Sequence, residues 1–576
     1  MQGAAGATNL YWAKGIQAAL PANGAAKNQV VFVNSVSCPS AGNCSAVGSY
    51  NARVSGGGLG LLLSQTAGKW TAGVEAALPE NASKTDPGAN LVSVSCASAG
   101  NCSAVGAYND NSGNTQGLLL TETGGSWKSG VEVSLPASAE ALHQLAGLQS
   151  VSCVSDGNCT AVGTYRDNNA DTQGLLLTET AGVWTTGVEA DLPANAAATV
   201  PAVSLSSVSC ASAGDCTAIG TYREYSGNNG EGLLLTESAG SWAKGLEAAL
   251  PPNAAATDEV VFARSVSCAS AGNCTAVGSY TDGSGKRLAL LLAEAAGSWA
   301  PGVEAALPTP PRPGINPSVS ADSVACASDG NCTAVGTYRD NNADTQGLLL
   351  TETAGVWTTG VEAPLPANAV TNAPAVALNS VSCASAGNCA AVGAYDTAES
   401  RQAEGLLLTE TAGRWTTGVE ALLPANARTN PSWPLSMTSV SCPSARHCSA
   451  VGTYGDNSGR QHGLLIVGSG RAGTLTVSKR GAGSGTVTSS PSGIACGSTC
   501  AHQFAQEKTV TLAATPRASS AFVGWSGACR GHRGCRVTIV SGSTVTATFA
   551  PKACVVPKLK RKPLQAADRS IRCHRR

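Results

Sequence analysis

Short apolar runs alternate with clusters of Gly, Asn, Asp and Ser along most of the chain, and their order repeats. Each copy contains S-V-S-C, then C-x-A-V-G-x-Y, then G-L-L-L-T-E, and finally W-x-x-G-V-E-A. Runs of this length between turn-forming residues are typical of strands, so each copy predicts a four-stranded antiparallel meander. We name its strands a, b, c and d. Strand c is a continuous leucine run, which predicts burial on both faces.

Eight copies follow one another with a period of 57 to 59 residues. The first repeat tryptophan, Trp12, precedes every cysteine pair, and no repeat tryptophan follows the eighth pair. The N-terminal Y-W-A-K-G-I-Q-A-A-L-P therefore supplies the strand that the eighth copy lacks. Splitting a repeat in this way closes a ring and removes its open edges. The pattern predicts an all-β chain, with residues 1–473 forming an eight-bladed β-propeller closed by the N-terminal strand.

The 22 cysteines indicate an oxidising compartment, because an even number at regular spacing predicts a disulfide framework. Each C-x5-C pair ends strand a and opens strand b, so a bridge can span the hairpin. Zinc is the alternative, although each pair offers two ligands where a structural site needs four. The predicted pairs are Cys38/Cys44, Cys96/Cys102, Cys153/Cys159, Cys210/Cys216, Cys268/Cys274, Cys326/Cys332, Cys383/Cys389 and Cys442/Cys448.

Charge gives little indication of a partner, since charged residues make up 13% of the chain and the net charge is −1. We expect no nucleic-acid partner and a monomer. No apolar run is long enough for a membrane helix, so no membrane span is expected. The cysteines favour a secreted or cell-envelope protein. The opening residues lack the features of a signal peptide, and we expect a truncation before them.

The aliphatic strand, the V-G strand and the turn T-E-T-A-G-V-W at residues 351–357 resemble the bacterial neuraminidase-repeat (Asp-box) propellers. The resemblance covers roughly residues 9 to 470 and implies the propeller fold. The turn lacks the aspartate of that family and is one residue shorter. The resemblance therefore supports the fold of this chain more strongly than an activity, because one propeller scaffold serves many functions.

Composition changes after residue 473, and residues 474–551 resemble a divergent internalin-type B repeat, a small β-rich module of secreted and surface proteins. The resemblance rests on Gly485, Gly493, Cys496, Cys500, Gly524, Trp525, Cys529 and Cys535. It implies disulfides between Cys496 and Cys500 and between Cys529 and Cys535, although pairing cannot be deduced from sequence alone.

The basic tail at residues 552–576 resembles the opening of a PASTA domain through its V-P-K-L-K and A-A-D-R segments. This resemblance implies attraction to anionic wall polymers, and a flexible, solvated tail is the alternative. Sequence does not decide how Cys554 and Cys573 pair.

Strands alternate in direction, so the b–c and d–a loops share one face of the ring, and these loops vary most between copies. Binding residues concentrate on variable loops of rigid scaffolds, so we expect the ligand on this face. A tyrosine followed by an acid recurs there and could bind sugars or cations; simple turn formation is the alternative. The candidates are Tyr108, Asp110, Tyr165, Arg166, Asp167, Tyr222, Arg223, Glu224, Tyr280, Asp282, Tyr338, Arg339, Asp340, Tyr395, Asp396, Tyr454 and Asp456.

Two loops with the sequence D-N-N-A-D match the opening of a calcium loop, although the later positions fail. A solvated turn is the alternative, and no other metal or cofactor is expected. The weak calcium candidates are Asp167, Asn169, Asp171, Asp340, Asn342 and Asp344.

No catalytic residues are predicted, because the repeated glutamates of strands c and d recur by symmetry, whereas an active site needs different residues converging on one centre. Residues 159–190 and 332–363 are identical, which favours duplication and multivalent use. We expect a non-catalytic binding or adhesion protein whose partner is a glycan, a cell-wall polymer or another protein. The alternatives are a sialidase-like propeller glycoside hydrolase and an architectural spacer without a ligand.

Overall fold

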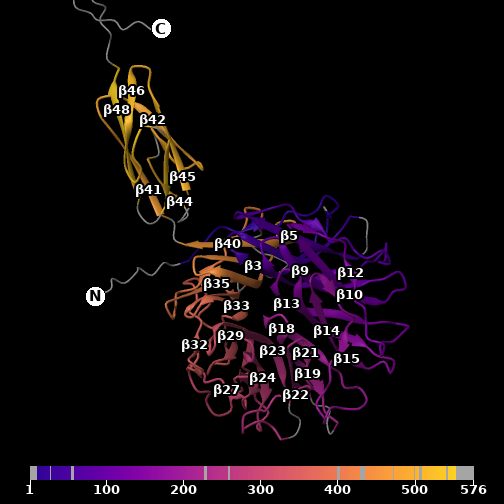
Figure 1. Ribbon diagram of the computed structural model, residues 1–576. Helices are drawn as coiled ribbons and strands as arrows, with labels where there is room; N and C mark the ends of the chain where they lie inside the picture. The colour runs from indigo at the N-terminus through magenta and orange to yellow at the C-terminus, as the bar shows by residue number, and fades with distance from the viewer. Residues whose placement is uncertain are drawn as a thin grey trace, which may run out of the picture. The chain divides into compact units, whose positions relative to one another are not determined.

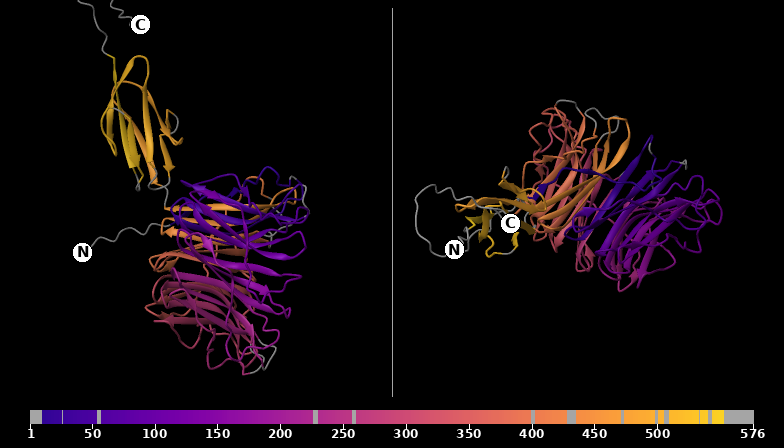
Figure 2. Two further views of the ribbon diagram at one scale, coloured as in Figure 1. Left: turned by 45° about the vertical axis from the view of Figure 1, so that its right-hand side comes forward. Right: turned by 90° about the horizontal axis from the view of Figure 1, so that it is seen from above.

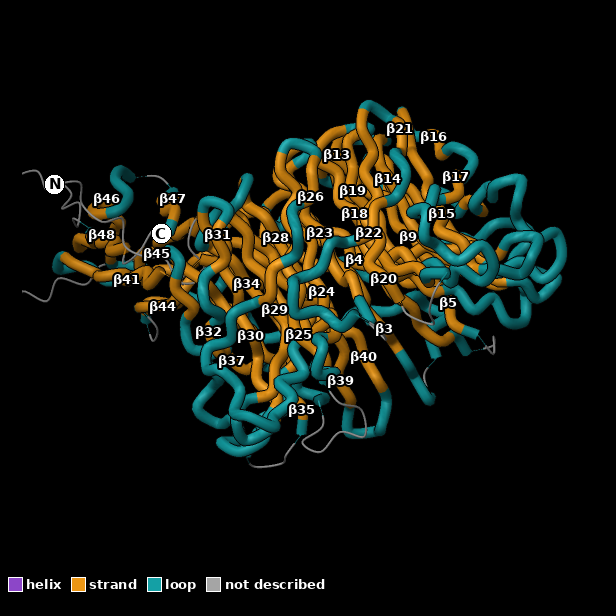
Figure 3. Tube along the Cα trace, turned by 90° about the horizontal axis from the view of Figure 1, so that it is seen from below, coloured by secondary structure: helices purple, strands orange, loops and turns teal. Residues whose placement is uncertain are grey.

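The computed structural model describes residues 10–552 except 26, 54–56, 226–229, 257–259, 399–401, 428–434, 471–472, 498–499, 505–508, 533 and 540–542. Every element in these ranges is a β-strand (Figure 3). A helix that could span a membrane is not among the elements of these residues. The chain divides into two units, residues 1–468 and 469–576, and each is described by itself.

The first unit contains eight sheets, which are the blades of a propeller (Figure 1). In each blade, strands a, b and c pair antiparallel in order, and strand d consists of two short segments, d1 and d2, that both pair with strand c. The predicted all-β, eight-bladed architecture is confirmed.

The bounds of these strands follow in order of blades 1 to 8. Strand a is β3 (Val31–Ser40), β8 (Asn90–Ser98), β13 (Ala146–Ser155), β18 (Ser204–Ser212), β23 (Phe262–Ser270), β28 (Ser320–Ser328), β33 (Ala377–Ser385) and β38 (Ser436–Ser444). Strand b is β4 (Asn43–Asn51), β9 (Asn101–Asn109), β14 (Asn158–Arg166), β19 (Asp215–Arg223), β24 (Asn273–Thr281), β29 (Asn331–Arg339), β34 (Asn388–Asp396) and β39 (His447–Gly455). Strand c is β5 (Gly58–Thr66), β10 (Thr115–Thr123), β15 (Thr172–Thr180), β20 (Gly230–Ser238), β25 (Arg287–Ala295), β30 (Thr345–Thr353), β35 (Ala403–Thr411) and β40 (Gln461–Gly470).

The outer segments of the blades are much shorter. Segment d1 is β6 (Lys69–Trp70), β11 (Ser126–Trp127), β16 (Val183–Trp184), β21 (Ser241–Trp242), β26 (Ser298–Trp299), β31 (Val356–Trp357), β36 (Arg414–Trp415) and β1 (Leu10–Trp12). Segment d2 is β7 (Val74–Glu75), β12 (Val131–Glu132), β17 (Val188–Glu189), β22 (Leu246–Glu247), β27 (Val303–Glu304), β32 (Val361–Glu362), β37 (Val419–Glu420) and β2 (Ile16–Gln17).

The N-terminal strand completes the eighth blade, as predicted. Both β1 and β2 pair with β40, and Ile16 lies opposite Leu465. The indole nitrogen of Trp12 donates to Thr409 Oγ1 of blade 7 at 3.3 Å. Strand β38 also contacts β3, so the blades form a closed ring whose indigo start lies beside its orange end (Figure 2).

Serines of the repeated S-V-S-C join the innermost strands of neighbouring blades. The backbone N–H groups of Val151 and Cys153 donate to Ser93 Oγ at 3.3 Å and Ser95 Oγ at 2.9 Å. The same pattern joins blade 8 to blade 1, where Val36 N–H donates to Ser439 Oγ at 3.2 Å. These bonds satisfy backbone groups that the sheet of each blade leaves unpaired.

The glycine of A-V-G is required by a β-bulge in strand a. In blade 2 the register of β8 against β9 shifts between Leu91 and Ser93. A Cβ atom on Gly106 would lie 1.9 Å from the carbonyl oxygen of Asn90. Only glycine permits this approach of two backbones.

The core lies between the blades, where the leucines of strand c are covered on both faces. Leu175, Leu176 and Leu177 are at most 2% exposed. Val47 and Leu62 of blade 1, for example, share one apolar cluster with Leu118 of blade 2. This packing confirms the expected two-sided burial of the leucine run.

The second unit contains two four-stranded sheets. Their strands are β41 (Gly473–Arg480), β42 (Gly485–Ser490), β43 (Ala495–Cys496), β44 (Ala501–Phe504), β45 (Thr509–Pro516), β46 (Ser520–Gly527), β47 (Cys535–Thr538) and β48 (Ser543–Pro551). Trp525 and Phe549 are buried in its apolar core. Two disulfides join Cys496 to Cys500 and Cys529 to Cys535.

Candidate functional site

Clefts lie between neighbouring blades on the face that carries the a–b and c–d turns, which we call the turn face. The cleft between blades 2 and 3 has a volume of about 570 Å³, and that between blades 3 and 4 about 560 Å³. Lys128, Cys153 and Trp184 line the first of these. Such volumes suit small ligands. The sequence, by contrast, predicts a ligand on the opposite face, here called the loop face.

Each repeat cysteine pair forms a disulfide at the a–b turn. The Sγ atoms of Cys153 and Cys159, for example, are 2.06 Å apart. Because both thiols of a pair are used in this bond, the zinc alternative has no ligands there. The same bond joins Cys38 to Cys44, Cys96 to Cys102, Cys210 to Cys216, Cys268 to Cys274, Cys326 to Cys332, Cys383 to Cys389 and Cys442 to Cys448.

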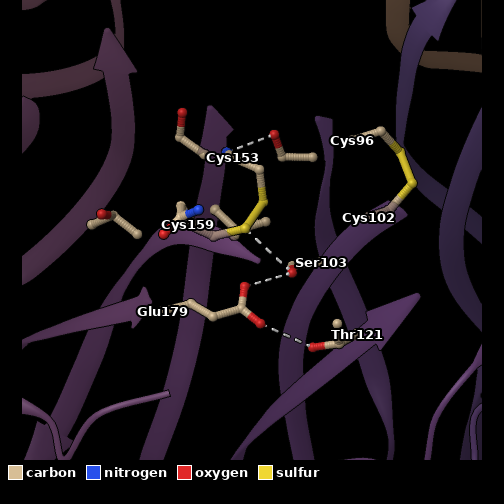
Figure 4. The surroundings of a disulfide bond; sticks show 12 residues. Cys96, Cys102, Ser103, Thr121, Cys153, Cys159 and Glu179 are labelled. Carbon is tan, nitrogen blue, oxygen red and sulfur yellow. Dashed lines mark hydrogen bonds between the residues drawn. A yellow bond between two sulfur atoms is a disulfide. The ribbon is translucent and has the colours of Figure 1, made fainter. Parts of the chain in front are cut away.

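A buried glutamate lies beside the disulfide, at the end of strand c (Figure 4). Glu179 of blade 3 accepts hydrogen bonds from two hydroxyls of blade 2, Ser103 Oγ at 3.1 Å and Thr121 Oγ1 at 3.4 Å. Ser103 Oγ also lies 3.4 Å from the Sγ atom of Cys159. The carboxylate therefore links two blades and is only 1% exposed.

Two glutamates of this series lack such partners. Both carboxyl oxygens of Glu237 and Oε2 of Glu410 are buried without a hydrogen bond among the described residues. Burial raises the pKa of Glu410 to about 7. Burial, and then the charge of Asp215, also raise the pKa of Glu237. At equivalent positions the pKa is also raised by burial, against the opposing effect of hydroxyl hydrogen bonds, in Glu122, Glu179, Glu294 and Glu352.

The tyrosines predicted to face a ligand are buried, and this part of the expectation is corrected. Tyr108 is 0% exposed, and its hydroxyl donates to Asn81 Oδ1 at 2.9 Å or Glu132 Oε2 at 2.6 Å. Burial, and then the contact with Glu132, raise the pKa of Tyr108. No ring face remains open for stacking. At most 2% of the residue surface is exposed in Tyr165, Tyr222, Tyr280, Tyr338, Tyr395 and Tyr454 as well.

The acids that follow these tyrosines hold the b–c loops in shape. Asp167 Oδ1 accepts the backbone N–H groups of Asn169 and Asp171 at 2.9 Å, and Gln173 donates to Oδ2 at 2.9 Å. Burial alone would raise the pKa of Asp167, but these hydrogen bonds outweigh it and lower the pKa. Backbone N–H groups of the loop are bound in the same way by Asp110, Asp282, Asp340 and Asp456.

This geometry disfavours the calcium interpretation. Both oxygens of Asp167 face N–H donors, whereas a calcium ion needs oxygens that are free to bind it. No group of three His, Cys, Asp or Glu residues suited to a metal ion occurs in the described ranges. The residues concerned are Asp167, Asn169, Asp171, Asp340, Asn342 and Asp344.

The remaining candidates lie at equivalent loop-face positions on separate blades. Arg166 Nε lies 3.8 Å from Glu140 Oε2, whereas Arg223 and Arg339 end strand b of blades 4 and 6. Glu224 forms an isolated β-bridge with Ala196, and Asp396 ends β34. These residues belong to four different blades, namely blades 3, 4, 6 and 7.

Sequence reasoning missed the exposed apolar side chains of the loop face. Tyr225 in the b–c loop of blade 4 is 80% exposed, and Leu142 in the d–a loop of blade 3 is 73% exposed. Leu145, Val200 and Val260 of the same sector are also exposed. Blades 3 to 5 therefore carry an apolar loop sector. The available signal was a second tyrosine, Tyr225, three residues after the Tyr222 that ends the strand b pattern.

The C-terminal module has a family match. Residues 474–553 match the divergent InlB B-repeat domain. This match confirms the resemblance that Gly485, Trp525 and the cysteines carry in the sequence. No curated protein matches the chain.

Several solved structures show a low similarity. A Hadza microbial sialidase, Hz136, is 10% identical over 55% of this chain and 64% of its own, with a TM-score of 0.32. The fungal lectin of Aleuria aurantia, a six-bladed propeller, is 10% identical over 58% of this chain and 96% of its own, with a TM-score of 0.25. A prolyl endopeptidase is 12% identical over 79% of this chain and 56% of its own, with a TM-score of 0.37. The chain spans less than two thirds of the sialidase's length, and these similarities identify no function.

Proposed function

We propose that this chain is a non-catalytic binding protein of an extracytoplasmic compartment that presents its loop face to glycans or cell-wall polymers. The main observation is that Glu179, Asp167 and the recurring tyrosines are bonded internally and that Glu237 and Glu410 are buried, while the apolar loop sector of blades 3 to 5 is exposed. A hydrolase needs two carboxyl groups free to act on one bond. A binding surface needs exposed side chains on a rigid support.

The internal bonding of the acids argues against hydrolysis at the repeat positions. Glu179 accepts from two hydroxyls, Asp167 accepts from its own loop, and Glu132 accepts from Tyr108 and Asn81. Each of these carboxyl groups has a structural partner. None is paired with a second free acid across an open site.

The apolar loop sector supports binding because it breaks the symmetry of the ring. Leu142, Val200 and Tyr225 belong to loops that differ from copy to copy, whereas the turn face repeats. Exposed aromatic and aliphatic side chains on variable loops are typical of binding sites. A saccharide ring can pack its apolar face on Tyr225.

The compartment and the domain division are part of the same proposal. Ten disulfides in the described residues persist only in oxidising surroundings. We place the propeller at residues 1–473, the β module at 474–551 and a PASTA-like wall-binding tail at 552–576. The tail beyond Lys552, with Cys554 and Cys573, lies outside the described residues. An Asp-box ancestry for the blades belongs to this proposal too.

Binding and turnover should be measured on the same preparations of the full chain. The protein is immobilised and probed with neutral and anionic oligosaccharides and cell-wall fragments, while fluorogenic glycosides report hydrolysis. The loop-face variant is Leu142→Ser with Tyr225→Ser. The matched control is Val183→Ser, which removes a side chain that is 69% exposed on the turn face.

We expect wild type and the control to bind a saccharide without turnover, and the loop-face variant to bind at least tenfold more weakly. Glycoside turnover would support the hydrolase alternative instead. Loss of binding in the control alone would move the site to the turn-face clefts. If the protein binds none of the probes, the alternative of an architectural spacer without a ligand is supported.

A further inference from the structure

Blade 5 departs from the repeat at positions that the fold brings together. Phe262 begins strand a, Arg264 occupies its bulge, and Arg287 begins strand c. The bulge residue in blades 1 to 4 and 6 to 8 is Asn34, Val92, Gln149, Ser206, Asp322, Asn379 and Thr438. The first residue of strand c in those blades is Gly58, Thr115, Thr172, Gly230, Thr345, Ala403 and Gln461. Arginine occurs at each position only in blade 5.

Both guanidinium groups lie over one aromatic ring. Cζ of Arg287 is 5.1 Å from the centroid of the Phe262 ring, and Cζ of Arg264 is 5.5 Å from it. Cation–π attraction holds a guanidinium in place through its face and leaves its N–H edge available. Two residues remote in the repeat pattern are thereby fixed beside each other.

One carboxylate of the next blade accompanies the two arginines. Arg264 Nε lies 4.0 Å from Asp322 Oδ1, and the two side chains are 47% and 29% exposed. No carboxylate oxygen in the described ranges lies within 4.0 Å of Arg287. The cluster therefore has an excess of positive charge among the described residues. Asp258 and Glu259, earlier in the d–a loop, lie outside them.

The position of the cluster favours a ligand over a purely structural role. It lies at the loop-face end of blade 5, where Val319 N–H of blade 6 donates to the Arg287 carbonyl at 2.9 Å. The neighbouring loops carry Tyr225 and Val260, which are exposed. A structural ion pair would need one arginine per carboxylate and would not need exposure.

We propose that Arg264 and Arg287 bind an oxyanion of an anionic saccharide at the loop-face end of blade 5. Guanidinium groups bind carboxylate, sulfate and phosphate through paired N–H donors, and these three groups are the shared chemistry. Phe262 positions both arginines. Asp322 opposes the ligand by its charge. The inference rests on the proposed function and deepens it by naming the ligand class.

The test measures dissociation constants of the full chain for saccharides of matched length. Polygalacturonate oligomers carry carboxylates, sulfated dextran carries sulfate, a glycerol phosphate polymer carries phosphate, and dextran is neutral. The variant is Arg264→Gln with Arg287→Gln. Its control is Lys69→Gln with Arg414→Gln, which removes the same charge from exposed positions on the turn face of blades 1 and 7. Thermal unfolding verifies that each variant folds.

We expect at least one anionic saccharide to bind more tightly than dextran, and the variant to lose at least tenfold in affinity while the control loses less than threefold. Asp322→Asn should increase the affinity, which a structural ion pair would not do. Equal losses in the two double variants, or weaker binding by Asp322→Asn, would overturn the site. Binding of dextran alone would overturn it and leave the proposed function standing. Absence of any binding would overturn both.

Discussion

At the scale of single residues, identical positions of the repeat differ through their neighbours. Glu179 is held by two hydroxyls of the preceding blade, whereas Oε2 of Glu410 has no partner in the described structure. A buried carboxyl group without donors is destabilised when it ionises. The pKa of Glu410 is raised to about 7 for this reason.

This raised pKa makes stability depend on pH. In the unfolded chain Glu410 ionises near its ordinary pKa of 4.5, whereas in the folded chain it stays protonated up to about pH 7. The contribution of protonated Glu410 to the free energy of unfolding is therefore fully present below pH 4.5 and is lost as pH rises through about 7. We expect Glu410→Gln to match wild type at pH 4 and to exceed it by up to about 3 kcal/mol at pH 8. Urea unfolding at both pH values measures this. Glu80→Gln, at an exposed position, is the control, and equal gains at both pH values would contradict the expectation.

The serines of S-V-S-C, which join the innermost strands of neighbouring blades, give a second prediction. Blade 6 lacks one of these hydroxyls. Ala325 stands where Ser267 of blade 5 accepts the N–H of Cys326 at 3.0 Å. Ala325→Ser should supply an acceptor for Cys383 and raise the unfolding free energy by about 1 kcal/mol. Ser267→Ala should lower it by a similar amount. Denaturant midpoints of both variants measure the effect, and a loss in Ala325→Ser would show that the site cannot hold a hydroxyl.

At the scale of elements, the c–d turns show a conformation that their sequence does not favour. Thr180 and Val183 pair across a two-residue turn in which Ala181 has φ 50° and Gly182 has φ 82°. Positive φ at both central residues defines a type I′ turn, for which Asn-Gly is favoured. Blade 2 has Gly124 at the first position, with φ 58°.

We therefore expect Ala181→Asn to stabilise the protein by roughly 0.5 to 1 kcal/mol, because asparagine tolerates the left-handed region better than alanine. The opposite effect is expected for Gly124→Ala in blade 2, which should lower the free energy of unfolding by a similar amount. Chemical unfolding midpoints compare the two. A loss of stability in Ala181→Asn would mean that the turn is held by contacts that the larger side chain breaks.

The elements also show what the sequence could predict and what it could not. The strands, the two-sided burial of the leucine run and the closing strand follow from local pattern and from the split repeat. The burial of Tyr108 does not, because it depends on Asn81 and Glu132, which lie 27 residues before it and 24 after it. The cluster at Phe262 likewise depends on contacts between strands and blades, whereas a strand pattern gives only local order.

At the scale of the whole propeller, the disulfides stabilise single blades, whereas the pairing of the N-terminal strand stabilises the closed ring. Every disulfide of the first unit joins cysteines six residues apart within one blade. No disulfide in the described structure crosses the seam between β1–β2 and β40. The seam is held by strand pairing, by the Trp12 indole and by Gln17, whose Oε1 accepts a hydrogen bond from Asn426 Nδ2 at 2.9 Å.

Removal of residues 1–17 should therefore open the ring although all disulfides remain. The deletion exposes the outer edge of β40 and uncovers Gly468, against which the Trp12 ring packs. Free strand edges pair with other chains, so we expect a melting temperature lower by several degrees and concentration-dependent association. Calorimetry and light scattering measure both. Removal of residues 1–9 alone, which precede β1, is the control and should change neither the melting temperature nor the association. If the longer deletion leaves a monomer with an unchanged melting temperature, the seven other blades hold the ring closed.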